Sequence, residues 1–274
     1  MEKTGTVKDK YGFLPLSVWH LIKSPKWKKM IMDTGDTENT RRSANAIHLP
    51  SLKYSEFNPN VAERIVAYWS DIGDLVIDPF GGRATRAIIT TELSRNYVGY
   101  EISPKTHKLT VDRLEYRDTS FPEDMFYPRG TSDIILGDGC ALADSLDDSA
   151  DLVMTCPPYH NLEKYEDVDN QLSTIKEYSD FLEKIQECTN NIHRVLKQDK
   201  FCAWVCGDWR NQSKGGFFAF HRDSIACFEN SGMSLWDIVI LHNNSPFASK
   251  QAGKCEKQKY TSKIHEYLLI FKKQ

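Results

Sequence analysis

Residues 74–87 read DLVIDPFGGRATRA, and this stretch decides the fold. It begins with an apolar, β-branched run that stops at Asp78 and Pro79, which is typical of a buried strand in a parallel sheet. Two glycines follow, and residues 84–95 (ATRAIITTELSR) then place apolar side chains at helical spacing. The stretch predicts a strand, a tight glycine turn and a helix whose N-terminus faces a ligand.

The segments that follow alternate in the same way. The sequence predicts strands at 96–103, 151–158, 201–208, 234–243 and 263–273, and helices at 178–198 and 221–232. Strands that alternate with helices predict an α/β fold with a doubly wound, mostly parallel sheet, and the two closely spaced C-terminal strands predict an antiparallel addition. A chain of 274 residues is long enough to bury one large core of this kind.

The cysteine content and the apolar runs indicate in which cellular compartment the protein is expected. Seven cysteines are an odd number without paired spacing, which predicts reduced thiols rather than disulfides. Cys202 and Cys206 are four residues apart, but no second Cys or His pair lies nearby, so we expect core thiols and no metal site. No run is apolar enough for a signal peptide or a membrane span, so we expect a soluble, cytoplasmic protein without membrane contact.

The charge is small in total but uneven along the chain. The net charge is −3, yet residues 139–183 hold eleven acidic side chains against two lysines. Residues 242–274 reverse this, with seven lysines against two glutamates, and KSPKWKK at 23–29 is a second basic cluster. Each run could be a solvated face, or the two basic segments could converge on a polyanion.

The glycine turn and an acidic residue downstream indicate an adenosine-containing ligand. The turn, with Gly81 and Gly82, is not the G-x-G-x-x-G fingerprint of dinucleotide-binding proteins. Glu101 follows the next strand, about twenty residues on, where a carboxylate can accept hydrogen bonds from both hydroxyls of a ribose. NAD and S-adenosylmethionine (SAM) both fit this pattern.

Four motifs in a set order carry a resemblance to a known family. They are FNPNVAERIVAYWSDIGDLVIDPFGGRATR (57–86), NYVGYEI (96–102), IILGDG (134–139) and DLVMTCPPY (151–159). In this order they resemble the SAM-dependent DNA amino-methyltransferases, in particular the DNA modification methylases of bacteriophages and prophages. The resemblance extends over residues 11–274 and implies a Rossmann-like class I SAM methyltransferase fold, with SAM as the cofactor.

The resemblance also assigns cofactor contacts. The glycine turn would face the methionine end of SAM, Glu101 would hold the ribose, and Asp138 would lie at the adenine or next to it. The implied cofactor residues are Phe57, Asn58, Pro59, Asp78, Pro79, Phe80, Gly81, Gly82, Glu101, Ile102 and Asp138. Ala84 stands where the family has a third glycine, a departure that a helix N-terminus tolerates. Asp78 as a simple cap and Asp138 as a turn residue remain structural alternatives.

The implied catalytic turn is Cys156, Pro157, Pro158 and Tyr159. In the family this turn begins with Asp, Asn or Ser. That side chain and the first proline carbonyl accept from the target amino group, while the aromatic ring stacks on an extruded base. A thiol is a weaker acceptor. Because serine is its nearest isostere and is associated with N4-cytosine targets, we expect N4-cytosine slightly over N6-adenine. Attack by Cys156 on cytosine C5 is an alternative, although that family places its cysteine after a proline.

The implied partner is double-stranded DNA. The expected phosphate contacts are Lys26, Lys28, Lys29, Lys250, Lys254, Lys257 and Lys259. We expect residues 1–50 to be an N-terminal extension that could contact DNA. Residues 51–274 would be the catalytic domain of a monomer or homodimer, without a separate target-recognition domain.

Other functions stay open at this point. A methyltransferase for RNA or protein amines would share the chemistry of the turn, and a SAM-binding but catalytically silent DNA-binding subunit would explain Cys156. Asp208 and Arg210, at a strand end, could organise the site or contact DNA, whereas His265 and Glu266 are interpreted as structural residues near its edge.

Overall fold

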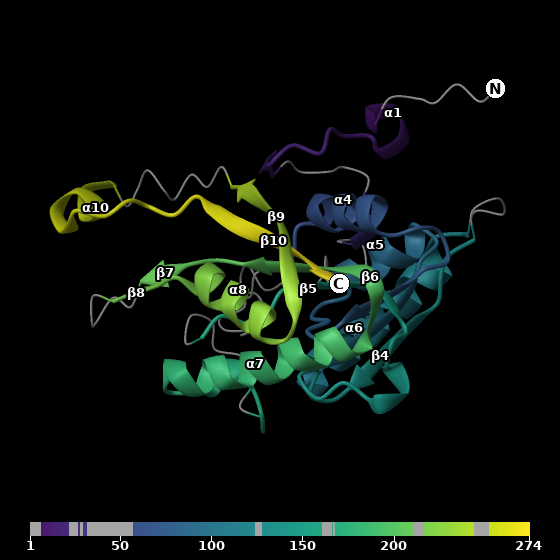
Figure 1. The fold of residues 1–274 in the computed structure, drawn as a ribbon. Coiled ribbons are helices and arrows are strands. Elements are labelled where there is room, and N and C mark those ends of the chain that lie inside the picture. Colours follow the sequence, from purple (N-terminus) through teal and green to yellow (C-terminus); the bar gives the residue numbers. More distant parts are fainter. Residues whose placement is uncertain are drawn as a thin grey trace, which may run out of the picture.

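The computed structural model describes residues 7–21, 27, 30–31, 57–123, 128–160, 166, 168–210, 216–243 and 252–274. These residues form an eight-stranded sheet with helices on both faces, and a two-stranded ribbon beside it (Figure 1). The strands are β1 (Val18–His20), β2 (Leu75–Asp78), β3 (Asn96–Glu101), β4 (Ser132–Leu136), β5 (Ala150–Thr155), β6 (Leu196–Cys206), β7 (Trp209–Arg210), β8 (Phe217–Phe218), β9 (Met233–His242) and β10 (His265–Lys273). The helices are α1 (Val7–Tyr11), α4 (Pro59–Trp69), α5 (Thr85–Glu92), α6 (Pro104–Ser120), α7 (Tyr178–Val195), α8 (Phe220–Asn230) and α10 (Ala252–Gln258).

The sheet has the strand order β1-β9-β10-β6-β5-β2-β3-β4. The strands β6, β5, β2, β3 and β4 pair in parallel, whereas β10 is antiparallel to both of its neighbours, β6 and β9. β9 therefore runs in the direction of the central strands, although it forms the predicted antiparallel pair with β10. The predicted doubly wound, mostly parallel sheet with an antiparallel C-terminal strand is confirmed.

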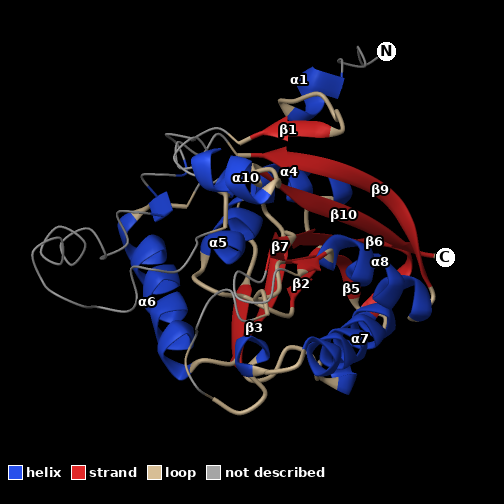
Figure 2. Cartoon of the chain, turned by 90° about the vertical axis from the view of Figure 1, so that its left-hand side faces the viewer, coloured by secondary structure: helices blue, strands red, loops and turns tan. Residues whose placement is uncertain are grey.

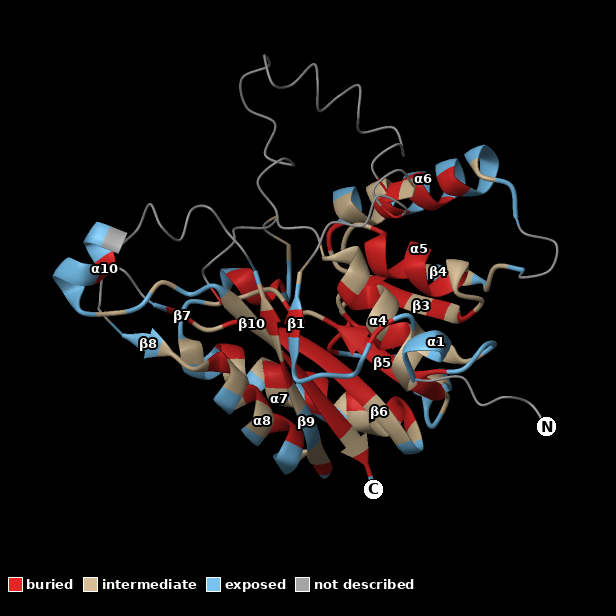
Figure 3. Ribbon diagram, turned by 90° about the horizontal axis from the view of Figure 1, so that it is seen from above, coloured by how far each residue is buried: buried red, intermediate tan, exposed pale blue. Residues whose placement is uncertain are grey.

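Two hydrophobic clusters pack against opposite faces of the sheet. The helices α4 and α5 lie on one side of the central strands, and α7 and α8 lie on the other (Figure 2). β5 is buried along its whole length, and its side chains alternate: Leu152 and Met154 join the cluster with α4 and α5, whereas Val153 joins the cluster with α7 and α8. Burial is concentrated in the central strands and the inner sides of these helices, while α10 is largely exposed (Figure 3). A strand covered on both faces must be apolar throughout, which is why DLVMT could be recognised as one.

One predicted helix end differs from the structure, and one strand lies within the expected N-terminal extension. The helix predicted at 178–198 ends at Val195, because Leu196 is extended and pairs with Ala150 in the sheet, so strand pairing overrides the helical spacing of its last residues. β1, inside the expected N-terminal extension, is an edge strand of the main sheet and pairs in parallel with β9.

All seven cysteines are free thiols, as predicted, and Cys156 alone among them is half-buried rather than buried. Across the described ranges, every helix is too short or too polar to traverse a lipid bilayer.

Parallel strands bring their carboxyl ends to one edge of the sheet. β2 ends at Asp78, β3 at Glu101, β5 at Thr155 and β6 at Cys206, and the four strands lie within one run of the strand order. In open α/β sheets, ligands bind outside this edge. The glycine turn, Glu101 and the Cys-Pro-Pro-Tyr turn are therefore neighbours in space.

Candidate active site at the carboxyl edge of the sheet

The carboxylate of Asp78 is the fixed point beneath the site. Its Oδ2 accepts from Arg86 Nε at 2.5 Å and from the Tyr97 hydroxyl at 2.7 Å. Its Oδ1 accepts from the Thr155 hydroxyl at 2.6 Å and from the Phe80 N–H at 3.0 Å. Asp78 is fully buried, and these bonds join β2, β3, β5 and α5. Asp78 therefore fixes the position of the glycine turn through hydrogen bonds to Phe80 and Arg86.

The glycine turn passes very close to β3. Gly81 donates its N–H to the Tyr100 carbonyl at 2.7 Å, and a Cβ at Gly81 would lie 3.1 Å from that carbonyl oxygen. Gly82 has φ +59°, a conformation that glycine adopts freely. Ala84 has φ 68°, so the residue that replaces the family's third glycine is left-handed. This conformation costs a residue with a side chain about 1–2 kcal/mol, so the departure is tolerated but strained.

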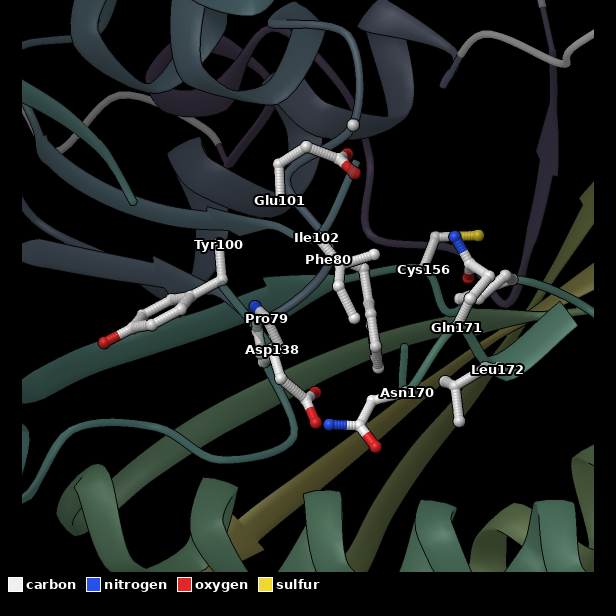
Figure 4. A pocket seen from close by; sticks show the side chains of 13 residues that line it. Pro79, Phe80, Tyr100, Glu101, Ile102, Asp138, Cys156, Asn170, Gln171 and Leu172 are labelled. Atoms are coloured by element: carbon white, nitrogen blue, oxygen red, sulfur yellow. The ribbon is translucent and has the colours of Figure 1, made fainter. Parts of the chain in front are cut away.

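A cavity of about 550 Å³, including its open mouth, lies above this turn. Its lining residues are Pro79, Phe80, Gly82, Tyr100, Glu101, Ile102, Asp138, Gly139, Cys156, Pro158, Asn170, Gln171 and Leu172. In Figure 4, Phe80 separates the side of the cavity with Tyr100 and Asp138 from the side with Cys156 and Gln171.

Glu101 supplies a carboxylate to the cavity wall. Burial raises its pKa to about 7, although N–H groups of Ser103 and Gly82 donate to it and oppose the rise. The Ser103 N–H lies 2.8 Å from Glu101 Oε1. Hydroxyl groups of a bound diol would donate to the ionised carboxylate and compensate for its lost hydration. On a second wall, Asp138 accepts from the Cys140 N–H at 2.9 Å and lies 3.4 Å from Lys184 Nζ.

The thiol of Cys156 reaches the same cavity. Its Sγ lies 4.0 Å from the Pro157 carbonyl oxygen and 4.0 Å from the Tyr159 hydroxyl oxygen. Burial, together with the negative charge of Glu266, raises the pKa of the Cys156 thiol to about 12. The thiol is therefore protonated at neutral pH. Nucleophilic attack requires the thiolate, so this environment disfavours the alternative of covalent attack on cytosine C5.

Tyr159 is anchored at both ends. Its hydroxyl donates to Glu266 Oε1 at 2.8 Å, and its ring stacks on Trp209 with centroids 6.0 Å apart and planes 19° apart. Trp209 in turn stacks on Phe218 at 5.4 Å. Three aromatic rings therefore lead from the Pro-Pro turn to the β7–β8 ribbon.

A histidine and a buried carboxylate form a pair beside this stack. His221 Nδ1 lies 2.8 Å and 2.9 Å from the two carboxylate oxygens of Asp208, whose side chain is 2% exposed. The His221 ring stacks on Tyr267 with centroids 4.2 Å apart. The sequence pointed to Asp208 because it follows a strand. His221 and Tyr267 carried no motif of their own and were missed.

A cationic and aromatic surface lies on the ribbon and beyond α10. The Arg210 guanidinium lies 5.0 Å from the ring centroid of Phe217 and 5.1 Å from that of Tyr260. Lys263 Nζ lies 4.8 Å from the Phe217 centroid. Arg210, Phe217 and Lys263 are exposed. Such contacts hold cations in place while leaving them open to solvent.

The structure brings most predicted cofactor residues together. Those on the cavity wall are Pro79, Phe80, Gly82, Glu101, Ile102 and Asp138. Asp78 and Gly81 are not on the wall but support it. Of the predicted catalytic residues, Cys156 and Pro158 line the cavity, Pro157 is buried and Tyr159 is half-buried.

The predicted segment 57–59 lies off the cavity wall, at the N-terminus of α4. The Asn58 side chain caps this helix by accepting from the Asn60 N–H at 2.9 Å. The Phe57 ring lies 4.7 Å from the Arg86 guanidinium, so it contacts the support of the glycine turn. The cavity-lining residues 170–172 had no motif, and sequence reasoning missed them.

The predicted phosphate-contacting lysines are only partly placed. Lys254, Lys257 and Lys259 are exposed on α10 or directly after it. The remaining members of that set lie outside the described residues, namely Lys26, Lys28, Lys29 and Lys250.

The fold and the cavity define a class of protein. In the sheet, β10 lies antiparallel between β6 and β9, and a glycine turn and a strand-end carboxylate face one cavity. This arrangement is that of the class I SAM-dependent methyltransferases. The sequence matches the DNA methylase family over residues 8–112 and 150–274, and the chain belongs to this family. The expected methyltransferase class and its cofactor, SAM, agree with the family and the fold.

Two curated relatives are Type II methyltransferases. M.XycI of Xanthomonas campestris pv. cyanopsidis is 29% identical over 90 residues, which cover 32% of this chain and 30% of that protein. M.Cfr9I of Citrobacter freundii is 27% identical over 104 residues, which cover 37% of this chain and 33% of that protein. The matched region therefore spans about a third of the length of these relatives.

Solved structures share the fold at low identity. A SAM-dependent methyltransferase from Methanosarcina mazei has a TM-score of 0.50 and 11% identity, and the match covers 76% of this chain and 96% of that one. The [4+2]-cyclase SpnF has a TM-score of 0.52 and 16% identity, with 79% and 80% covered. These likenesses show the fold alone, and a cyclase among them illustrates that the reaction must be argued from the site.

Proposed function

We propose that the protein transfers a methyl group from SAM to an exocyclic amino group of a DNA base, with N4 of cytosine favoured over N6 of adenine. The observation that carries this proposal is the shared cavity. Cys156 and Pro158 of the catalytic turn line the same space as Glu101 and the glycine turn. A cofactor bound there lies directly against the turn that receives the amine, as in-line transfer requires.

The cavity residues suit SAM. When bound, SAM supplies an electrophilic methyl group on a sulfonium sulfur. Glu101 accepts from the ribose hydroxyls, the apolar walls formed by Phe80, Ile102 and Leu172 exclude water, and the tight turn at Gly81 and Gly82 allows close approach of the backbone.

The turn suits methyl transfer to an amino group rather than to C5 of cytosine. The protonated thiol of Cys156 does not attack cytosine C5, whereas the Pro157 carbonyl remains an acceptor for an N–H group whatever residue precedes it. The Tyr159 ring offers an aromatic surface for a base. Since a base inside a duplex cannot reach a buried methyl donor, the target nucleotide is extruded from double-stranded DNA.

The surface around the site suits a nucleic-acid backbone. Arg210 lies on the ribbon that continues the Tyr159 stack, Lys263 lies near the Phe217 ring of that ribbon, and exposed lysines of α10 extend the positive charge. α10, β7 and β8 lie at one end of the molecule (Figure 1). Contacts of this kind give affinity with little sequence information. We also propose that residues 51–274 form the catalytic domain without a separate target-recognition domain, that sequence specificity is short or loose, and that the protein has a cytoplasmic location where DNA is accessible.

The test is incubation of the chain with isotopically labelled SAM and unmodified duplex DNA, digestion to nucleosides, and mass spectrometry of the products. N4-methylcytosine is the expected product. N6-methyladenine would overturn the choice of base and keep the reaction class. Parallel reactions with single-stranded DNA, RNA and bulk protein compare substrate classes, and SAM binding without any transfer would favour a silent subunit.

A further inference from the structure

The turn that receives the target amine has no charged acceptor of its own. Cys156 carries a thiol, and sulfur is a weak hydrogen-bond acceptor. Thr155, just before it, donates its hydroxyl to Asp78 at 2.6 Å. Asp78 itself is fully buried, and both of its oxygens already accept bonds from the protein. The Pro157 carbonyl is therefore the turn's neutral acceptor for the amine, and a charged acceptor must come from another element.

Glu266 of β10 brings a carboxylate to this point. The Tyr159 hydroxyl oxygen lies 2.8 Å from Glu266 Oε1 and 4.0 Å from Cys156 Sγ, so the carboxylate and the thiol share one neighbour. Burial holds the pKa of Tyr159 well above its usual value. The tyrosine is therefore neutral, and its hydroxyl donates to the carboxylate.

The pairing of β10 with β6 places the Glu266 side chain next to Gly207. Tyr267 of β10 pairs with Cys206, the last residue of β6, so Glu266 lies beside Gly207. A Cβ at Gly207 would lie 3.6 Å from Glu266 Cγ and 3.5 Å from the Tyr159 hydroxyl. These two side chains therefore pack directly over the glycine backbone, at the carboxyl end of β6.

We propose that Glu266 is the acceptor for the target amine and takes over the function that Asp, Asn or Ser has at the first position of the turn in related methylases. This inference rests on the proposed function and deepens it. The amine nitrogen bonds to the methyl carbon while the carbon–sulfur bond breaks and its electron pair stays on sulfur. The nitrogen then carries a positive charge, which the Glu266 carboxylate stabilises. One N–H proton passes from the nitrogen to Glu266 and from there to water.

The test compares the unaltered chain with Glu266→Gln, Cys156→Asp and the double variant. Glu266→Gln keeps an oxygen for the Tyr159 hydroxyl and removes the charge. We expect the methyl-transfer rate at saturating SAM to fall by about 100-fold, with unchanged SAM affinity. The double variant restores a carboxylate next to the amine and is expected to recover at least about tenfold of that loss. Cys156→Asp alone places two carboxylates together, which raises the pKa of one of them, and gives no gain.

A second readout does not depend on catalysis. Iodoacetamide alkylation of Cys156 is followed against pH by mass mapping, which is selective because the other six cysteines are buried. Removing the negative charge in Glu266→Gln is expected to move the alkylation profile to lower pH. Glu115→Gln, at an exposed glutamate on α6, is the matched control and is expected to leave both the profile and the rate unchanged.

Each outcome separates the inference from the proposed function. A Glu266→Gln variant with the unaltered rate, or a loss that the double variant does not relieve, would overturn the role of Glu266. If the unaltered chain binds SAM but methylates no DNA, the proposed function fails, and an unshifted alkylation profile would then overturn the inference on its own. Should Glu266→Gln not fold, Glu266→Asp withdraws the carboxylate by one methylene, and an unaltered rate in that variant would count against the assignment.

Discussion

Asp78 and Arg86 form an ion pair beneath the glycine turn, with 2.5 Å between Oδ2 and Nε and side-chain exposures of 0% and 6%. Asp78→Asn leaves the Arg86 charge buried without its counter-charge. We expect the free energy of unfolding to fall by about 3–5 kcal/mol, measured by denaturant unfolding.

The matched control for that variant is Asp112→Asn, which breaks the exposed pair between Lys108 and Asp112 on α6. Exposed pairs of this type contribute about 0.5 kcal/mol or less. Equal losses in the two variants would contradict the supporting role of Asp78.

SAM affinity is expected to depend on pH through Glu101. Its pKa is raised from 4.5 to about 7 in the empty site, and the ionised form accepts from the ribose hydroxyls. Affinity should therefore rise as pH rises through about 7 and level off above it. Titration calorimetry over this range measures the effect, and Glu101→Gln is expected to weaken binding and remove the pH dependence. An unchanged pH profile in that variant would rule out Glu101 as the origin.

The same shift predicts the pH dependence of stability in the absence of ligand. The folded protein holds the Glu101 proton more tightly than the unfolded chain, because burial disfavours the charge. This contribution is present in full below pH 4.5 and is lost as pH rises to about 7. The free energy of unfolding of Glu101→Gln, compared with the unaltered chain across that window, should lack this decline.

Gly139 is expected to admit no side chain. A Cβ at this position would lie 1.7 Å from the Pro79 carbonyl oxygen, so Gly139→Ala must displace the backbone at the start of the glycine turn. We expect loss of SAM binding and a lower melting temperature. Gly253→Ala in α10 is the control, because its Cβ would meet no atom within 4 Å. That variant should bind SAM normally and gain about 0.5–1 kcal/mol in stability.

DNA affinity is expected to depend on Arg210 and Lys263. Replacing both by Ala should weaken binding and lower the slope of log K against log salt by about 0.9 for each phosphate that is no longer neutralised, while SAM affinity stays the same. Fluorescence anisotropy at several salt concentrations measures the slope. Lys272→Ala is the control, since Lys272 also lies over an aromatic ring, Trp236, but pairs with Asp199 on β6. An unaltered slope in the double variant would remove this surface from the proposed interface.

The parts of the site that could be predicted from the sequence directly follow strands. Gly81, Glu101 and Cys156 each come after an apolar run that is buried on both faces, and parallel strands must bring such residues to one edge. Position after a strand is a local property, so one sequence suffices to locate it. The segment at Phe57 was assigned by resemblance alone, and its contact with SAM stays a prediction.

The residues that the sequence did not place depend on contacts between distant segments. Glu266 had only a structural interpretation, because its proximity to Tyr159, 107 residues away, requires β10 to enter the sheet beside β6. The pair of His221 and Asp208 requires α8 to begin at the end of β6.

By itself, then, the sequence determined the alternation of strands and helices, the glycine turn and the Cys-Pro-Pro-Tyr turn, because hydrophobic periodicity and backbone chemistry are encoded in neighbouring residues. Only the tertiary structure decided which carboxylate accepts from the Tyr159 hydroxyl beside Cys156 and which cations flank the aromatic ribbon. Strand order is set by packing of the whole core, and side chains from separate strands meet only after that core has formed.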